Sequence, residues 1–174
     1  MAIDMKRLIA EHFDALVRQR GIDKVTVTAL IEDCGISRQT FYYHFQDLMD
    51  VVEWSANQAA ERMVERSLKS GSTQAALAEL IRSTAANRVL IKKLIDSQRR
   101  PQVERILFKA MHSYLEELLR RRPNGLTGEY RDAELALEFL SFGLAGILFN
   151  HCGDPELDAD ELAARLMRIL SERM

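Results

Sequence analysis

The chain has 174 residues, of which 24 are Lys or Arg and 26 are Asp or Glu, so its formal net charge is −2. This length suits a small recognition module joined to a second helical domain, and the near-neutral charge excludes bulk attraction to nucleic acid. The two cysteines are too far apart for a local motif, which argues against a disulfide framework. The start lacks a signal-peptide pattern, so we expect a cytoplasmic protein.

The first predicted element is an amphipathic helix over about residues 3–20. Ile9, Phe13 and Val17 recur at helical spacing and form its apolar stripe. Gly21 follows as a stop signal. We therefore expect one side of this helix to pack against its neighbours in the chain.

Residues 25–45 indicate two short helices joined by a tight turn. Thr26 is suited to cap the first helix, because its hydroxyl can accept from an unpaired backbone N–H. Gly35 falls where a helix C-terminus needs a left-handed residue, and Ser37 is placed to cap the second helix. The stretch therefore predicts a helix-turn-helix.

The second of these helices has two chemically different sides. Phe41 and Phe45 are four residues apart and share a buried side. Side chains that can bond bases or phosphates project elsewhere: Arg38, Gln39, Tyr42 and Tyr43. A packed helical hairpin without a ligand is the alternative, but this concentration of polar groups favours entry into the DNA major groove.

Residues 21–52 resemble the N-terminal domain of the TetR/AcrR family of bacterial transcription regulators. The resemblance runs through Gly21, Thr26-Val27, Cys34-Gly35-Ile36-Ser37 and Thr40-Phe41-Tyr42-Tyr43-His44-Phe45. Within the family, Arg38-Gln39-Thr40-Phe41-Tyr42 and Glu53-Trp54 resemble the branch that includes the co-activator of dihydroxyacetone kinase operons. The resemblance implies a homodimeric DNA-binding regulator.

The resemblance also implies roles for individual residues. Thr26, Tyr42 and His44 would contact phosphates, whereas Arg38, Gln39, Thr40 and Tyr43 would lie nearest the base edges. Lys6 could reach the flanking DNA backbone. The full predicted DNA-binding set is Thr26, Thr28, Ser37, Arg38, Gln39, Thr40, Tyr42, Tyr43, His44 and Lys6.

Leu48 departs from the family pattern, which usually has a phosphate-holding Lys at this position. Residues 1–50 also contain six Lys or Arg against eight Asp or Glu, and phosphate binding depends on positive charge. The sequence alone predicts that Leu48→Lys would strengthen DNA binding and steepen its salt dependence. The competing interpretation is a helical interaction protein or co-activator that acts mainly through a protein partner and binds DNA weakly.

The rest of the chain is predicted to be helical over about residues 47–69, 74–86, 89–98, 101–121 and 132–150, with a last helix after a capping pair at Asp158 and Glu161. Pro123-Asn124-Gly125 indicates a turn. The preceding Arg120-Arg121-Arg122 run is either a basic patch or, as we favour, compensation of a helix dipole by solvated charges.

The helix over about residues 132–150 is apolar nearly all the way round, which predicts burial on every side. A second copy could cover its outer side, with close approach at Gly143 and Gly146; a flattened helix in a monomer core is the alternative. Glu138 and Ser141 interrupt the stretch, which looks too short for a membrane span. The predicted dimer interface is Leu137, Leu140, Leu144, Ile147, Leu148, Leu162, Leu166 and Ile169.

We find no sequence signal for catalysis, a metal site or a cofactor. The four histidines have no metal-ligand spacing, and neither a phosphate loop nor a nucleophile elbow occurs. The family resemblance implies an effector, either a small molecule or a protein. Candidate pocket residues, each of which could equally be core, are Trp54, Asn87, Phe108, Met111, His112, Tyr114, Phe142 and Asn150.

Together these patterns predict an all-α fold of about nine helices. Residues 1–46 would form a three-helix DNA-binding domain, and residues 47–174 an effector-binding and dimerisation domain. Each chain of a homodimer would place helix 37–45 in the major groove of a near-palindromic operator. The sign of regulation stays open.

Overall fold

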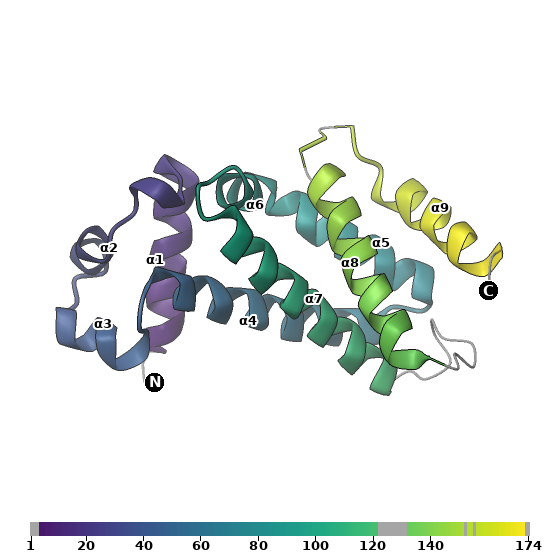
Figure 1. The fold of residues 1–174 in the computed structure, drawn as a ribbon, viewed down its shortest axis with the longest axis horizontal. Helices are drawn as coiled ribbons and strands as arrows, with labels where there is room; N and C mark the ends of the chain where they lie inside the picture. The colour runs from purple at the N-terminus through teal and green to yellow at the C-terminus, as the bar shows by residue number, and fades with distance from the viewer. Residues whose placement is uncertain (1–3, 122–131, 152, 155, 173–174) are drawn as a thin grey trace. The chain divides into compact units, whose positions relative to one another are not determined.

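The computed structural model describes residues 4–121, 132–151, 153–154 and 156–172. Over these residues the chain is all-α, as predicted, and forms nine α-helices and one short 3₁₀ helix (Figure 1). The helices are α1 (Met5–Arg20), η1 (Ile22–Lys24), α2 (Val27–Cys34), α3 (Arg38–His44), α4 (Leu48–Lys69), α5 (Thr73–Ala86), α6 (Arg88–Ile95), α7 (Arg100–Arg121), α8 (Ala133–His151) and α9 (Ala159–Glu172). The expected turn at residues 123–125 and the third arginine of the run, Arg122, lie outside the described residues.

The observed helix bounds lie close to the predicted ones except near residues 96–98. There α6 ends at Ile95 instead of continuing to Gln98. Two hydrogen bonds draw the chain away from the helix axis: the Ser97 hydroxyl donates to the Leu94 carbonyl at 2.6 Å, and the Gln98 N–H donates to the Asp23 carboxylate at 3.1 Å. These side chains compete with the backbone for hydrogen bonds and stop the helix.

Contacts divide the chain into two compact units. The N-terminal unit comprises Met1–Gln58 and Val89–Leu107, and the C-terminal unit comprises Ala59–Arg88 and Phe108–Met174. Helices α4 and α7 therefore contribute residues to both units. The predicted boundary at residue 46 separates a DNA-binding domain from an effector-binding domain by function, not by contacts. It stays a prediction.

The core of the N-terminal unit is built from α1, α2, α3 and the first turns of α4, with α6 and α7 contributing single side chains. Phe13 and Val17 of α1 are buried together with Phe41 of α3, as their spacing predicted. Leu94 and Val103 complete the cluster. Because apolar side chains from α1 and α3 share one core, the helix-turn-helix is held rigidly on α1.

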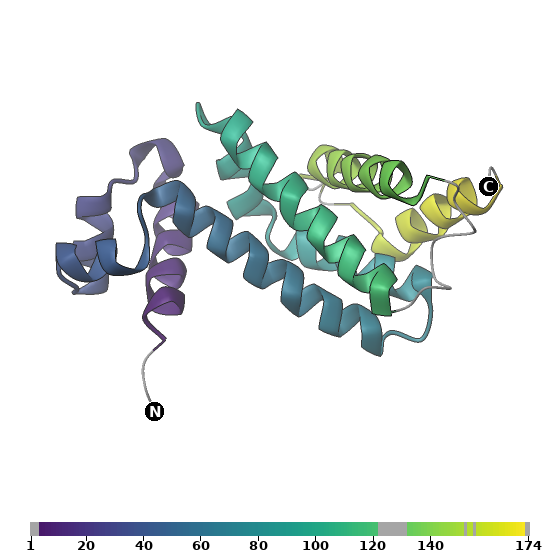
Figure 2. The same ribbon diagram turned by 60° about the horizontal axis from the view of Figure 1, so that its bottom comes forward.

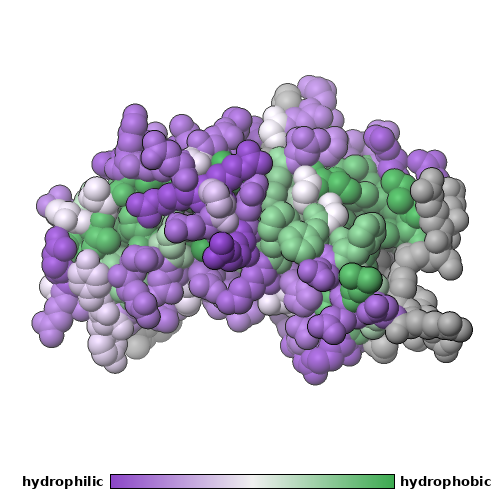
Figure 3. Space-filling view, viewed as in Figure 1, coloured by the Kyte–Doolittle hydropathy of each residue, from purple (hydrophilic) through white to green (hydrophobic). Residues whose placement is uncertain are grey.

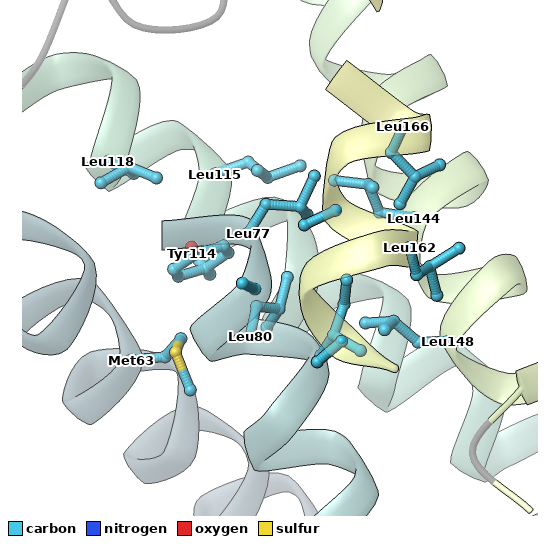
Figure 4. Packing of buried hydrophobic residues seen from close by; sticks show 14 of the residues in the cluster. Met63, Leu77, Leu80, Tyr114, Leu115, Leu118, Leu144, Leu148, Leu162 and Leu166 are labelled. Carbon is cyan, nitrogen blue, oxygen red and sulfur yellow. The ribbon is translucent and has the colours of Figure 1, made fainter. Parts of the chain in front are cut away.

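The core of the C-terminal unit joins α4, α5, α7, α8 and α9. Leu77, Leu115 and Leu144 point toward one another from α5, α7 and α8 (Figure 4). Helix α9 packs on α5, and Arg82 donates to the Asp160 carboxylate at 2.9 Å at the edge of that contact. Burial of the apolar stripe of α9 thus closes the core on this side.

One polar pair lies inside the C-terminal unit. The fully buried Ser67 hydroxyl is 2.9 Å from the Tyr114 hydroxyl, so each buried oxygen has a partner. Burial raises the pKa of Tyr114, and its hydrogen bond with Ser67 offsets only part of that shift. The phenol therefore stays neutral and acts as a core side chain.

Helix α8 is buried on one side only. Leu140, Leu144 and Leu148 face the core, whereas Phe139 on the other side is 72% exposed. Figure 3 shows hydrophobic surface gathered over this helix. By length and composition alone α8 is long enough to cross a membrane, so its length does not exclude a span, contrary to the sequence argument. Core helices of other proteins are equally long and apolar, so these properties are weak evidence for a membrane span.

Candidate nucleic-acid interface

Helix α2 has the local structure that its sequence predicted. The Thr26 hydroxyl accepts from the Ala29 N–H at 3.1 Å and caps the helix. At the other end Gly35 adopts φ 67° and ψ 32°, the left-handed conformation, and the Ile36 N–H donates to the Ile31 carbonyl at 3.1 Å. This is a Schellman motif, which fixes the direction in which the chain leaves α2.

Helix α3 begins directly after this turn. Ser37 is its N-cap and accepts from the Thr40 N–H at 3.0 Å, and the Ser37 and Thr40 hydroxyls lie 2.8 Å apart. Figures 1 and 2 show α2 and α3 beside α1, which both of them contact. The two caps therefore set the angle between the helices within a few residues of the turn.

Two phenylalanines anchor α3 to the N-terminal unit. Phe41 and Phe45 are buried, and their ring centroids are 6.2 Å apart. Trp54 lies edge-on to Phe45 at 6.2 Å, and the Lys6 ammonium lies 5.5 Å from the Phe45 ring centroid. Lys6 lies near the start of α1 and is half-buried, and the cation–π contact holds its ammonium at the Phe45 ring.

The opposite side of α3 is open to solvent. Tyr43 is 84% exposed, Tyr42 is 51% exposed, and Arg38 and Gln39 are also exposed. The guanidinium of Arg38 donates from Nη2 to the Thr28 hydroxyl at 2.9 Å. The residues that the sequence predicted to project from α3 are thus all exposed, and one of them contacts α2.

His44 ends the helix in a different environment from its neighbours. It is half-buried, with its ring edge-on to Tyr43 at a centroid distance of 4.9 Å. Between residues 34 and 46 the chain has no Asp or Glu, so the exposed side of α3 carries no negative side chain of its own. This local charge suits a surface that meets phosphates.

A contact between α1 and α2 was missed by the sequence analysis. His12 Nδ1 lies 2.7 Å from Asp33 Oδ2, across 21 residues of sequence. The contact therefore adds a polar attachment between α1 and α2 to their apolar packing. No spacing rule connects residues this far apart, so only the fold reveals it.

The start of α4 corrects the interpretation of Leu48. Asp47 caps the helix by accepting from the Met49 and Asp50 N–H groups at 2.7 and 2.9 Å. Leu48 itself is 4% exposed and belongs to the core of the N-terminal unit. A lysine there would have to displace core packing, which argues against the expectation that Leu48→Lys simply adds a phosphate contact.

Cys34 lies at the C-terminal end of α2 and is half-buried. Burial, and secondarily the charge of Asp33, raises the pKa of its thiol to about 11. The thiol is therefore protonated at neutral pH and is a poor nucleophile. The described residues contain no group of His, Cys, Asp or Glu able to hold a metal ion.

The residues predicted for an effector pocket do not gather at one cavity. Trp54 packs in the N-terminal unit, whereas Phe108 contacts Phe142 and Phe149 in the C-terminal unit at centroid distances of 4.8 and 5.7 Å. Met111 packs against the C-terminal core, the His112 ring lies 3.5 Å from the Ser141 hydroxyl, and Asn87 and Asn150 are exposed.

An apolar cavity of about 30 Å³ does occur within the C-terminal unit. Of the predicted pocket residues only Tyr114 lines it, beside Leu77 of α5 and Leu140 of α8. This volume is about that of one water molecule, far below the several hundred Å³ of pockets for drug-sized ligands. Sequence periodicity could not find it, because core and pocket side chains have the same spacing.

The predicted dimer residues lie mostly in the core of their own chain. Leu137 and Ile147 are partly buried against that core, and only Ile169 is exposed. The other five are buried: Leu140, Leu144, Leu148, Leu162 and Leu166. The outward side of α8 instead presents Leu135, Phe139 and Phe142.

The described arginines of the run at the end of α7 are paired with carboxylates. Arg120 and Arg121 both donate to Glu117, and Arg121 also donates to Glu65 at 2.8 Å. These hydrogen bonds lower the pKa of Glu117 to about 2. A solvated ion-pair network at a helix end, the interpretation that we favoured, fits these contacts better than a free basic patch.

Comparison with known proteins agrees with this geometry. Residues 14–50 match the sequence model of a family described as bacterial regulatory proteins, tetR family. A search of curated proteins finds no match.

Solved structures share the fold over nearly the full length of the chain. The dihydroxyacetone kinase operon activator DhaS is 16% identical, with a TM-score of 0.69, over 97% of this chain and 95% of its own. The fatty acid degradation regulator FadR from Bacillus halodurans is 17% identical, with a TM-score of 0.64, over 98% and 96%. FadR from Bacillus subtilis, solved in complex with stearoyl-CoA, is 18% identical, with a TM-score of 0.58, over 94% and 96%.

The all-helical fold with its helix-turn-helix is that of tetR-family transcription regulators. Residues 14–50 match the tetR family of bacterial regulatory proteins, which supports the resemblance seen in the sequence. The likeness to DhaS is one of fold, so the more specific assignment to the co-activator branch stays a prediction.

Proposed function

We propose that the chain is a homodimeric, effector-responsive regulator that reads a near-palindromic operator with α3 in the major groove. The observation that carries this proposal is the two-sided chemistry of α3. Phe41 and Phe45 fix the helix to a rigid core, while Arg38, Gln39 and Tyr43 project into solvent. The N-terminal residues of a recognition helix are those that reach base edges.

The exposed residues fall into two groups, one proposed to contact base edges and one proposed to contact phosphates. Arg38, Gln39 and Tyr43 are assigned to base edges, because Arg and Gln can each bond a base edge through two atoms. Thr40 lies next to these residues, and its hydroxyl is hydrogen-bonded with the Ser37 hydroxyl. The predicted phosphate contacts are Thr26, Tyr42, His44 and Lys6.

The homodimer is supported by the outward side of α8. Leu135, Phe139 and Phe142 form an exposed apolar strip, and a side chain added at Gly143 or Gly146 would meet nothing within 4 Å. Exposed apolar patches mark association surfaces, and small residues let two helices approach closely. The interface that we propose therefore uses this strip, joined by Ile169 of α9, in place of the buried leucines.

The effector is proposed to act through the C-terminal unit. The cavity beside Tyr114 is too small for a metabolite unless the helices around it separate. An effector that binds one arrangement of the C-terminal unit better than another would change the separation of the two α3 helices and so shift operator affinity. A protein effector on the surface would act through the same linkage.

The DNA-binding proposal is tested by selection. Purified protein is incubated with duplexes of random sequence at near-physiological salt, and the bound fraction is sequenced after several rounds. We expect an enriched motif with two half-sites separated by whole helical turns. Weak binding without an enriched sequence would favour the competing interpretation, an interaction protein with an acidic N-terminal region.

The dimer proposal is tested by Phe139→Glu. This charge would be buried in the proposed interface, so sedimentation velocity should show dissociation into single chains at concentrations where the wild type is dimeric. Val89→Glu, at another exposed apolar residue, is the matched control and should leave the dimer intact. A dimeric Phe139→Glu protein would place the interface elsewhere.

A further inference from the structure

The Thr28 hydroxyl and the Arg38 guanidinium form a bridge across the exposed side of the helix-turn-helix. Thr28 lies in the first turn of α2, and Arg38 is the first residue of α3. Arg38 Nη2 donates to Thr28 Oγ1 at 2.9 Å, and both residues are exposed. The bond therefore joins the N-terminal ends of the two helices where they face solvent.

The type of side chain that holds Arg38 determines whether its positive charge stays available to a ligand. A carboxylate at the position of Thr28 would also hold the guanidinium, but it would neutralise the positive charge. A hydroxyl fixes the side chain and leaves its charge uncompensated. The arginine stays available to a ligand rich in acceptors.

The bridge uses one of the five N–H donors of Arg38 and leaves four. A guanine presents two acceptors, O6 and N7, in the major groove, and arginine is the side chain that most often bonds both. A free arginine loses rotamer freedom when it is immobilised, which weakens binding by about 2- to 12-fold. An arginine already held by Thr28 avoids part of that loss.

We infer that Thr28 is a positioning residue that holds Arg38 for two-atom recognition of a guanine in each half-site. The inference rests on the proposed function, because it assumes that α3 enters the major groove. It assigns to Thr28 an indirect role: the hydroxyl acts on DNA through Arg38 and does not contact the duplex itself.

The test is a double-mutant cycle on the duplex obtained by selection with the wild-type protein. Dissociation constants for that duplex and for a scrambled one are measured with wild type, Thr28→Val, Arg38→Ala and the double variant. Thr28→Ser is the conservative rescue, because it keeps the hydroxyl. Thermal unfolding of each variant confirms that the exposed substitution leaves the fold intact.

We expect Thr28→Val to weaken binding to the selected duplex by about 2- to 12-fold, with Thr28→Ser restoring it. In the Arg38→Ala background the same change should have no further effect. Equal losses in both backgrounds would show that Thr28 contacts DNA directly and would overturn the inference while leaving the proposed function in place. If the wild type selects no sequence, the proposed function fails, and the inference fails with it.

The base itself is tested by replacing single guanines of the selected duplex with 7-deazaguanine, which lacks the N7 acceptor. One guanine in each half-site should be sensitive to this change in the wild type and insensitive in Arg38→Ala. A wild type that is indifferent at every guanine would overturn the assignment of Arg38 to this base.

Discussion

The exposed aromatic residues of the two units contrast in their surroundings. In the N-terminal unit, Tyr42 and Tyr43 carry hydroxyls and stand beside Arg38 on a short helix fixed by buried rings. In the C-terminal unit, Phe139 and Phe142 are exposed without a polar group at their tips. Both surfaces leave aromatic area in water, but only the first offers directional hydrogen bonds.

This difference assigns the two surfaces to different kinds of partner. Bases and phosphates are recognised by placed donors and acceptors, which the N-terminal unit supplies. An apolar helix face gains most from excluding water against a matching face, which a second copy of the chain can supply. Substitutions of the residues that hold each surface in place can test this distinction between the two units.

The largest effect is expected for Phe41→Ala. This side chain is fully buried beneath the recognition surface, so its removal should lower the free energy of unfolding by about 3–5 kcal/mol. The single tryptophan, Trp54, packs against Phe45 in the same unit, and its fluorescence in urea reports the loss. Tyr43→Ala, at the exposed neighbour, should change stability by less than about 0.5 kcal/mol. Similar losses in both variants would contradict the two-sided description of α3.

Leu48→Lys should destabilise the N-terminal unit by about 2–4 kcal/mol, because it removes a buried leucine and places a charge in the core. Gln46→Lys adds the same charge at an exposed residue two positions earlier and should leave stability nearly unchanged. Urea denaturation of both variants gives the comparison. A Leu48→Lys protein as stable as the wild type, with a steeper salt dependence of DNA binding, would instead support the expectation from the family pattern. That expectation is that a lysine at this position contacts a phosphate.

Gly35→Ala should cost about 1–2 kcal/mol, because an alanine at φ 67° is strained even where its Cβ meets nothing within 4 Å. Gly71 also has open space around it, but it is not among the glycines with positive φ, so Gly71→Ala serves as the control. In thermal unfolding, the Gly35→Ala protein should have a lower melting temperature than the Gly71→Ala protein. Equal melting temperatures would show that the turn tolerates other conformations.

The smallest effect is expected for Glu117, in the C-terminal unit. Hydrogen bonds from Arg120 and Arg121 lower its pKa from 4.5 to about 2. Its contribution to stability is therefore fully present above pH 4.5 and is lost as the pH falls toward about 2. The stability difference between wild type and Glu117→Gln should stay constant from pH 7 to 5 and shrink below that range. A difference that is independent of pH would contradict the pairing.

Much of the N-terminal unit was predictable because short-range rules determine it. Thr26, Gly35 and Ser37 act within three or four residues of their own positions, and helical spacing places Phe41 with Phe45. The contact of His12 with Asp33 and the burial of Leu48 depend on how separate helices pack, and no local pattern encodes them.

The C-terminal unit was harder to predict for a physical reason. Helix α8 is apolar all round, so its sequence has no periodicity that tells the core side from the outer side. The choice of Leu140 and Leu144 as outward residues placed the surface on the wrong side of the helix, since both are buried in their own chain. Amphipathic α9 left less ambiguity, and Leu162 and Leu166 could have been assigned to the core by their stripe.

If the exposed side of α3 reads DNA sequence, Arg38→Ala should remove sequence preference more than general DNA binding. Dissociation constants are measured for the selected duplex and a scrambled duplex at one salt concentration. We expect binding to the selected duplex to weaken by about 5- to 150-fold while binding to the scrambled duplex changes little. Equal weakening on both duplexes would show that Arg38 contributes only charge, and the account of α3 as the reading helix would be contradicted.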